Sequence, residues 1–117
     1  VTNESQVHEN YKDMIIKARD IDSRVTGRST GHPVRALRNQ MTKEYLQKEQ
    51  EGASFEELEL LTLGGLRKAV VEGDVKTGSV MAGQIAGMVK EKMSCHDLIQ
   101  KQVKETDDLI GGKGFYE

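Results

Sequence analysis

The ten residues Gly78–Gly87, with the sequence GSVMAGQIAG, form the most unusual stretch of this 117-residue chain. Their pattern predicts a turn that leads into a helix over about residues 79–90. Glycine inside a helix costs about 1 kcal/mol relative to alanine, yet this stretch holds three glycines and two alanines. They leave one face almost bare of side chains, and Gln84 adds a group that both donates and accepts hydrogen bonds. We interpret the stretch as a surface that lies against another body.

That body has two interpretations. The first is the flat ring of a cofactor, held near a helix N-terminus whose N–H groups favour anions and polar ring atoms. The second is a neighbouring helix that crosses closely over small residues. Spacing alone favours the second, because the stretch has neither the lysine of a phosphate-binding loop nor the GxGxxG fingerprint of a dinucleotide site.

The rest of the chain predicts a mainly α fold with almost no sheet, organised as one helical segment over residues 1–117. Apolar periodicity, capping residues and glycines set the element boundaries. In chain order, they predict a helix over about 6–19, a short strand at Val25–Thr26, a loop at Gly27–Gly31, a helix from Pro33 to about Gln50, a helix after the capping box at Ser54, a break at Gly64–Gly65 before the next helix, a last helix after Ser94, and a frayed tail over 111–117.

Composition narrows the classes of function. Basic residues number 17 and acidic residues 19, a balance that gives no reason to expect nucleic acid as a partner. No apolar run approaches the roughly 20 residues that span a bilayer, and no leader is visible, so we expect no membrane contact and a cytoplasmic location. The lone Cys95 fits a reducing compartment. Aromatic residues make up only 4%, which predicts a thin core and a chain that is a piece of something longer.

A second candidate site lies between Gly27 and Asn39. Hydroxyl groups and Arg28 in a loop, followed by Arg35 and Arg38 about one turn apart on the predicted helix, suit a phosphate or carboxylate. The alternative is a solvated basic face with Ser29 or Thr30 as a helix cap, which spacing alone slightly favours. We therefore name Arg28, His32 and Arg35 as candidates for substrate binding.

Other reactive side chains give no further site. His8, His32 and His96 lie far apart in the sequence and lack metal-ligand spacing, so we predict no metal site. Cys95 and His96 are adjacent, and adjacent residues on a helix point in different directions. We predict no catalytic residue in this chain.

Four blocks in order resemble the C-terminal third of the flavin-dependent enoyl-ACP reductase II enzymes and of the related nitronate monooxygenases (2-nitropropane dioxygenases). These blocks are Asn3–Asp22 in its NES, HENYK and KARDID segments, Gly31–Gln40, Lys68–Val75 and Gly78–Gly87. Each block alone is a weak match, but their common order across nearly the whole chain is specific.

The resemblance implies a (β/α)₈ barrel that holds FMN at the C-terminal ends of its strands, with a helical extension over the flavin. This chain would be that helical C-terminal region, without most barrel strands. By the same likeness Met81, Ala82, Gly83 and Gln84 approach the flavin. The family's active-site histidine lies in a Gly-Gly-His segment that this chain lacks, so we expect the chain alone to be inactive.

The resemblance leaves three functions open. The first is the reduction of an enoyl thioester in fatty-acid synthesis, with NADH or NADPH as reductant and FMN as cofactor. The thioester would be a small molecule or bound to acyl carrier protein. The blocks at Gly31–His32 and Gly78–Gly87 favour this function. The second is oxidation of a nitronate by FMN and oxygen. The third is a free-standing helical interaction module without catalysis. We also expect a homodimer or other self-association, because apolar faces would lack their barrel.

Overall fold

The computed structural model describes residues 1–111, which divide into two compact units. Val7–Lys90 form the larger unit, and Val1–Gln6 join the segment from Glu91 onward in the smaller one. The predicted frayed tail falls almost wholly on residues 112–117 and so lies outside the described residues.

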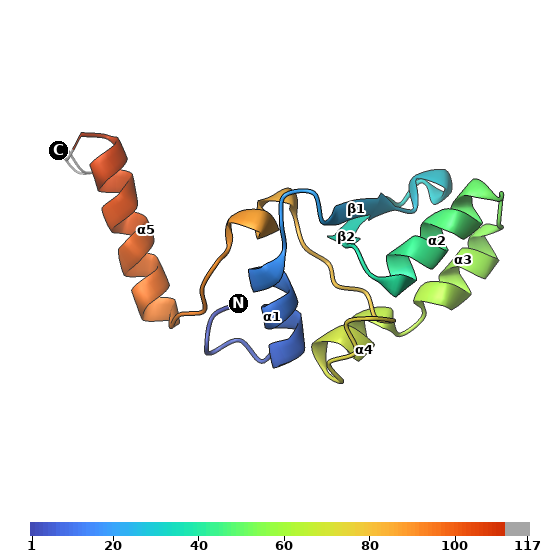
Figure 1. The fold of residues 1–117 in the computed structure, drawn as a ribbon, viewed down its shortest axis with the longest axis horizontal. Coiled ribbons are helices and arrows are strands. Elements are labelled where there is room, and N and C mark those ends of the chain that lie inside the picture. Colours follow the sequence, from blue (N-terminus) through green and yellow to red (C-terminus); the bar gives the residue numbers. More distant parts are fainter. Residues whose placement is uncertain (112–117) are drawn as a thin grey trace. The chain divides into compact units, whose positions relative to one another are not determined.

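Within residues 1–111, helices dominate and one small sheet interrupts them (Figure 1). The elements in order are α1 (Glu9–Lys17), β1 (Ser23–Thr26), the 3-10 turn η1 (Arg28–Thr30), β2 (Val34–Leu37), α2 (Gln40–Gln50), α3 (Phe55–Thr62), α4 (Gly65–Val70), the 3-10 turn η2 (Gln84–Met88) and α5 (Cys95–Leu109). The mainly α composition is therefore confirmed.

Several predicted boundaries are confirmed by the capping contacts that create them. The Ser54 hydroxyl accepts the Glu57 N–H at the start of α3, and the Ser94 hydroxyl accepts the Asp97 N–H at the start of α5. These bonds satisfy N–H groups that have no partner inside the helix. Gly64 separates α3 from α4 with a φ of 69°, a left-handed conformation that glycine adopts without strain.

The prediction of one helix from Pro33 to Gln50 is wrong in its first part. Val34–Leu37 form strand β2, which pairs antiparallel with β1 so that Val34 lies opposite Thr26. The helix begins only at Gln40, because the Asn39 side chain and Thr42 form a reciprocal capping box. Arg35 therefore lies in a strand and Arg38 follows it, so the two are not one turn apart on a helix.

The prediction of a helix over residues 79–90 is also wrong. The segment after Gly78 runs extended beside β2: the Leu37 N–H donates to the Val80 carbonyl at 2.8 Å, and the Ala82 N–H donates to the Arg35 carbonyl at 3.3 Å. Between these bonds Ala36 and Met81 form an antiparallel bridge. Backbone pairing with β2 thus replaces a helix that its glycines would have weakened, and only the η2 turn is helical.

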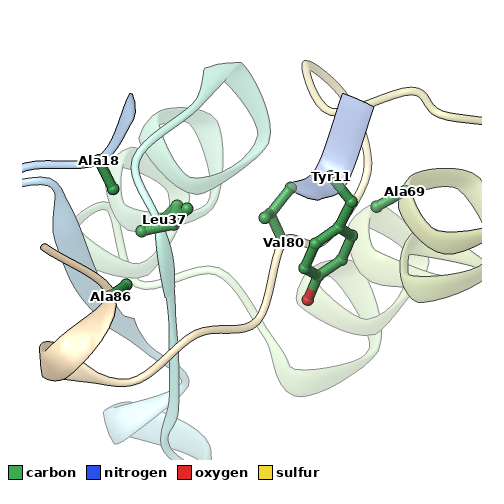
Figure 2. Close-up of a cluster of buried hydrophobic side chains, with 6 residues drawn as sticks. All are labelled: Tyr11, Ala18, Leu37, Ala69, Val80 and Ala86. Atoms are coloured by element: carbon green, nitrogen blue, oxygen red, sulfur yellow. The ribbon is translucent and has the colours of Figure 1, made fainter. Parts of the chain in front are cut away.

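The main core lies where α1, β2, α4 and the extended segment meet (Figure 2). Its buried members are Tyr11, Ala18, Leu37, Ala69, Val80 and Ala86. A second cluster, made of Met41, Tyr45 and Leu58, joins α2 to α3. Because Val80 is fully buried in the first cluster, the core fixes the backbone immediately before Met81.

The smaller unit is built on α5. Its exposed apolar side chains include Ile99 and Val103, while Lys104 forms an ion pair with Asp108 one turn away. Across residues 1–111 no helix is both long enough and apolar enough to cross a bilayer.

Candidate functional site

The four residues Met81–Gln84 leave the core as a segment held by its backbone. On one side the bond from Ala82 to Arg35 ties the segment to β2. On the other, the Tyr11 hydroxyl of α1 donates to the Met81 carbonyl at 2.6 Å. Burial raises the pKa of the Tyr11 phenol above its ordinary value. Tyr11 therefore stays protonated and remains a donor at neutral pH.

The same segment presents open backbone. Among the hydrogen bonds of the described residues, none uses the N–H of Met81, Gly83 or Gln84. A Cβ atom built on Gly83 would have no neighbour within 4 Å. The Gln84 side chain is exposed and makes no hydrogen bond to another described residue. The segment is thus an accessible edge with unused polar groups and little side-chain bulk.

A cavity of about 250 Å³ adjoins this edge through Met81. One part of its wall is apolar and another part is polar. Its lining comes from β1, the 27–33 loop, β2, α2, α3, α4 and the extended segment: Thr26, Thr30, His32, Val34, Ala36, Met41, Tyr45, Phe55, Glu59, Thr62, Leu66, Ser79 and Met81.

The loop Gly27–Gly31, which the sequence offers as an anion site, already holds a carboxylate of the chain itself. Glu49 of α2 accepts hydrogen bonds from the Gly27 N–H at 3.2 Å, the Ser29 N–H at 3.0 Å and the Ser29 hydroxyl at 2.6 Å. Burial raises the pKa of the Glu49 carboxyl, but these bonds outweigh burial and hold that pKa below its ordinary value. Glu49 therefore clamps the loop against α2.

This clamp predicts a pH-dependent loop. Because the pKa of Glu49 is lowered in the folded state, its contribution to stability is present above the ordinary glutamate pKa of about 4.3. That contribution is lost as the pH falls through the lowered folded value. NMR titration of the Gly27 and Ser29 amides should show a transition below the ordinary glutamate pKa, and Glu49→Gln should abolish it. A transition at or above the ordinary pKa would contradict the clamp.

The structure brings together one of the three candidate substrate-binding residues and one residue of the predicted flavin segment. His32 and Met81 line the same cavity. Arg28 is exposed in η1 outside that lining, and Arg35 donates from Nη1 to the Ser23 hydroxyl at 2.8 Å. Their predicted role in substrate binding stays a prediction. Within residues 1–111, no three His, Cys, Asp or Glu side chains gather as metal ligands would.

Sequence reasoning missed Tyr11 and Glu49. Tyr11 occupies an apolar position of a predicted helix. The helical spacing therefore predicts that its ring is buried, but not that its hydroxyl bonds to Met81. Glu49 is one of several charged residues on α2, and nothing local marks it as the partner of a loop 20 residues earlier. Both roles depend on contacts between segments far apart in the sequence, and local residue spacing does not predict such contacts.

Replacing Tyr11 with phenylalanine tests how the segment is held. The variant keeps the buried ring but leaves the Met81 carbonyl without its donor, so we expect a loss of about 1 kcal/mol in the free energy of unfolding. Hydrogen exchange should accelerate at Ala82, whose bond to Arg35 lies next to the lost contact, more than at the Leu98 amide of α5. Equal protection at Ala82 in both proteins would show that Tyr11 does not position the segment.

This chain is similar to solved structures of known proteins. A chain titled "Structure of FabK from Thermotoga maritima" is similar over 95% of this chain and 36% of its own length, at 39% sequence identity and a TM-score of 0.83. An M276A mutant of the same protein matches at 35% identity and a TM-score of 0.73, over 95% of this chain and 33% of its own. This chain therefore spans about a third of the solved structures that it matches.

A search of curated proteins finds no match. The family model described as nitronate monooxygenase matches residues 1–105, which is nearly the whole chain. Together with the FabK likeness, this match means that the chain belongs to the nitronate monooxygenase family, as a segment that corresponds to part of FabK.

Proposed function

We propose that this chain supplies one wall of the flavin site in an FMN-dependent enoyl-ACP reductase, which reduces enoyl thioesters with NADH or NADPH. We take FabK as a solved representative of that class. The observation that carries the proposal is the accessible edge at Met81–Gln84, in a chain 39% identical to FabK.

The residues of this edge fit a planar heterocycle. Gly83 has open space where a Cβ would stand, so no side chain holds a ring away from the backbone. The N–H groups of Gly83 and Gln84 make no hydrogen bond within the described chain, and the Gln84 amide both donates and accepts. A flavin has carbonyl oxygens and ring nitrogens along its polar edge, and these groups match such partners.

In this proposal FMN supplies the transfer of hydride, and the chain orients the reactants and excludes water. Tyr11 and β2 hold the edge in place from two sides. The apolar part of the adjoining cavity, at Val34, Phe55 and Met81, offers a surface for an acyl chain. The polar part offers His32 and hydroxyl groups to a thioester. The remaining parts of the reaction site would come from polypeptide outside this chain.

The test is Gly83→Leu in the intact flavoprotein. The added side chain would occupy the space proposed for the ring, so we expect FMN affinity and NAD(P)H-dependent turnover to fall at least about tenfold, a loss of roughly 1.4 kcal/mol of binding. The free energy of unfolding of the apoprotein should stay within about 0.5 kcal/mol. Gln100→Leu, which adds an exposed leucine to α5, is the matched control and should bind FMN normally. Unchanged FMN content and turnover in Gly83→Leu would exclude this edge from the flavin site.

The family match favours a second candidate, in which the flavin oxidises a nitronate with oxygen. The two activities differ in their reductant and in the size of their substrate. Assays of the intact protein with an enoyl thioester and NAD(P)H, and with a small nitronate and oxygen, separate them. Turnover of the nitronate alone would replace the reductase in this proposal.

A further inference from the structure

A groove separate from the Met81–Gln84 edge lies along the length of α2. Its volume is about 780 Å³, which falls in the usual range for small-molecule sites. It shares no lining residue with the cavity beside Met81. The lining residues are Arg24, Arg38, Asn39, Gln40, Thr42, Lys43, Leu46, Gln47 and Gln50.

The charge of this lining contrasts with the rest of the chain. Arg24, Arg38 and Lys43 line the groove and no acidic residue does, although the chain as a whole has a net charge of −2. Two carboxylates contact lining residues from outside the groove: Asp22 accepts from Arg38 at 3.0 Å and also pairs with Arg19, and Glu51 accepts from Gln47 at 3.5 Å. The groove is therefore locally cationic.

The pattern of α2 produces one wall of the groove. Gln40, Lys43, Gln47 and Gln50 recur at intervals of three and four residues, so they share one face of the helix. Among the described residues, the side chains of Gln40, Lys43 and Gln50 form no hydrogen bond or ion pair. This face offers donors that the fold leaves unused.

The two arginines are oriented by contacts that leave donors free. Arg24 Nη1 donates to the Ile21 carbonyl at 2.6 Å and the Ser23 carbonyl at 2.9 Å. Arg38 uses Nη2 for Asp22. A guanidinium carries five N–H donors, so each arginine keeps several for a ligand. Arginine held in this way matches phosphate oxygens in bidentate geometry.

We propose that this groove binds the phosphate or diphosphate group of a ligand, with Lys43 supplying a mobile charge and Arg24 and Arg38 supplying oriented donors. This assignment rests on the proposed function. The phosphate group would then belong either to the pantetheine arm of the thioester or to the nicotinamide dinucleotide. Both ligands carry phosphate groups of the same chemistry. The groove would hold the phosphate group, while the reacting end of the ligand lies outside the groove.

The test is calorimetric titration of the intact protein with inorganic pyrophosphate. We expect saturable binding that weakens as ionic strength rises. Lys43→Gln should weaken it about tenfold, as the loss of one charge-assisted contact implies, and Gln50→Glu should weaken it at least as much by adding a carboxylate. Lys68→Gln, which removes an exposed charge from α4 outside the groove, is the matched control and should change affinity less than about twofold.

Two further arms identify the source of the phosphate. ADP-ribose represents the dinucleotide and 4′-phosphopantetheine represents the thioester arm; the true source should bind more tightly than pyrophosphate and lose affinity in Lys43→Gln. The proposal is overturned if pyrophosphate does not bind, or if the Lys43→Gln variant binds it with normal affinity. It is also overturned if neither ADP-ribose nor 4′-phosphopantetheine binds more tightly than pyrophosphate. Because pyrophosphate binding needs no flavin, a protein that binds it but holds no FMN would refute the reductase function and leave the groove standing.

Discussion

Replacing Gly78 with alanine should destabilise the protein by about 3 kcal/mol, the upper end of the usual effect of overpacking. Gly78 is buried where the extended segment begins, against the backbone of α4 and of the turn at Asp74. An added Cβ would collide with the Asp74 carbonyl oxygen, and would lie 2.8 Å from the Ala69 nitrogen and 2.9 Å from the Gly65 oxygen. All three are backbone atoms, which cannot move aside as a flexible side chain does. Urea denaturation monitored by circular dichroism measures the loss.

The matched control is Gly83→Ala, five residues later in the same segment. Gly83 has a φ of −79° and a ψ of 176°, an extended conformation that alanine adopts without strain. Its added Cβ would meet nothing within 4 Å. We expect a change between zero and about 0.5 kcal/mol of stabilisation, because alanine reduces the freedom of the unfolded chain. Equal losses in the two variants would contradict the close approach at Gly78.

Asn39→Ala should cost about 3 kcal/mol, because one side chain joins three parts of the fold. Its Oδ1 accepts the Thr42 N–H and caps α2. Its Nδ2 donates to the carbonyls of Val75 and Gly78, each at 2.8 Å, in the turn before the extended segment. Alanine removes the cap and leaves both part-buried carbonyls without this donor. The free energy of unfolding from urea denaturation is again the measurement.

Asn39→Asp separates the two contributions. Aspartate caps a helix as well as asparagine does, so α2 should keep its first turn. The variant loses both donations and places a carboxylate oxygen against two carbonyls, which repel it. We expect it to be nearly as unstable as Asn39→Ala. Recovery of most of the stability by aspartate would show that the cap alone matters and that the link to Val75 and Gly78 is weak.

Local signals in the sequence predict the helix ends of this fold well. Ser54, Ser94 and Gly64 act through their own neighbours, so spacing reveals them. The strand β2 was hidden because its partner β1 lies across a loop, and because Val34 and Leu37 also fit the apolar period of the following helix. Pairing with a distant segment decides between strand and helix at these residues, and a short apolar run alone does not distinguish the two structures.

In the candidate site, too, local features are visible in the sequence and contacts between distant segments are not. The shortage of side chains at Ala82 and Gly83 is visible in the sequence, and the structure places that stretch on an open edge. Its conformation was not predictable, because the bridge from Ala36 to Met81 joins residues far apart in the chain. The cationic groove was missed for a related reason: Arg24 and Lys43 come from different elements and meet only through the packing of α2 on β1.

The bridge between Ala36 and Met81 also bears on the order in which the fold assembles. The hairpin of β1 and β2 closes across a short loop, and α2 and α3 are neighbours in the chain, so these parts have little loop entropy to overcome. Docking the extended segment onto β2 closes a much longer loop, and the segment's buried residues pack with α1 and α4 in the same core. The surface that we assign to the flavin is therefore expected to mature last during folding, after the framework that supports it has formed.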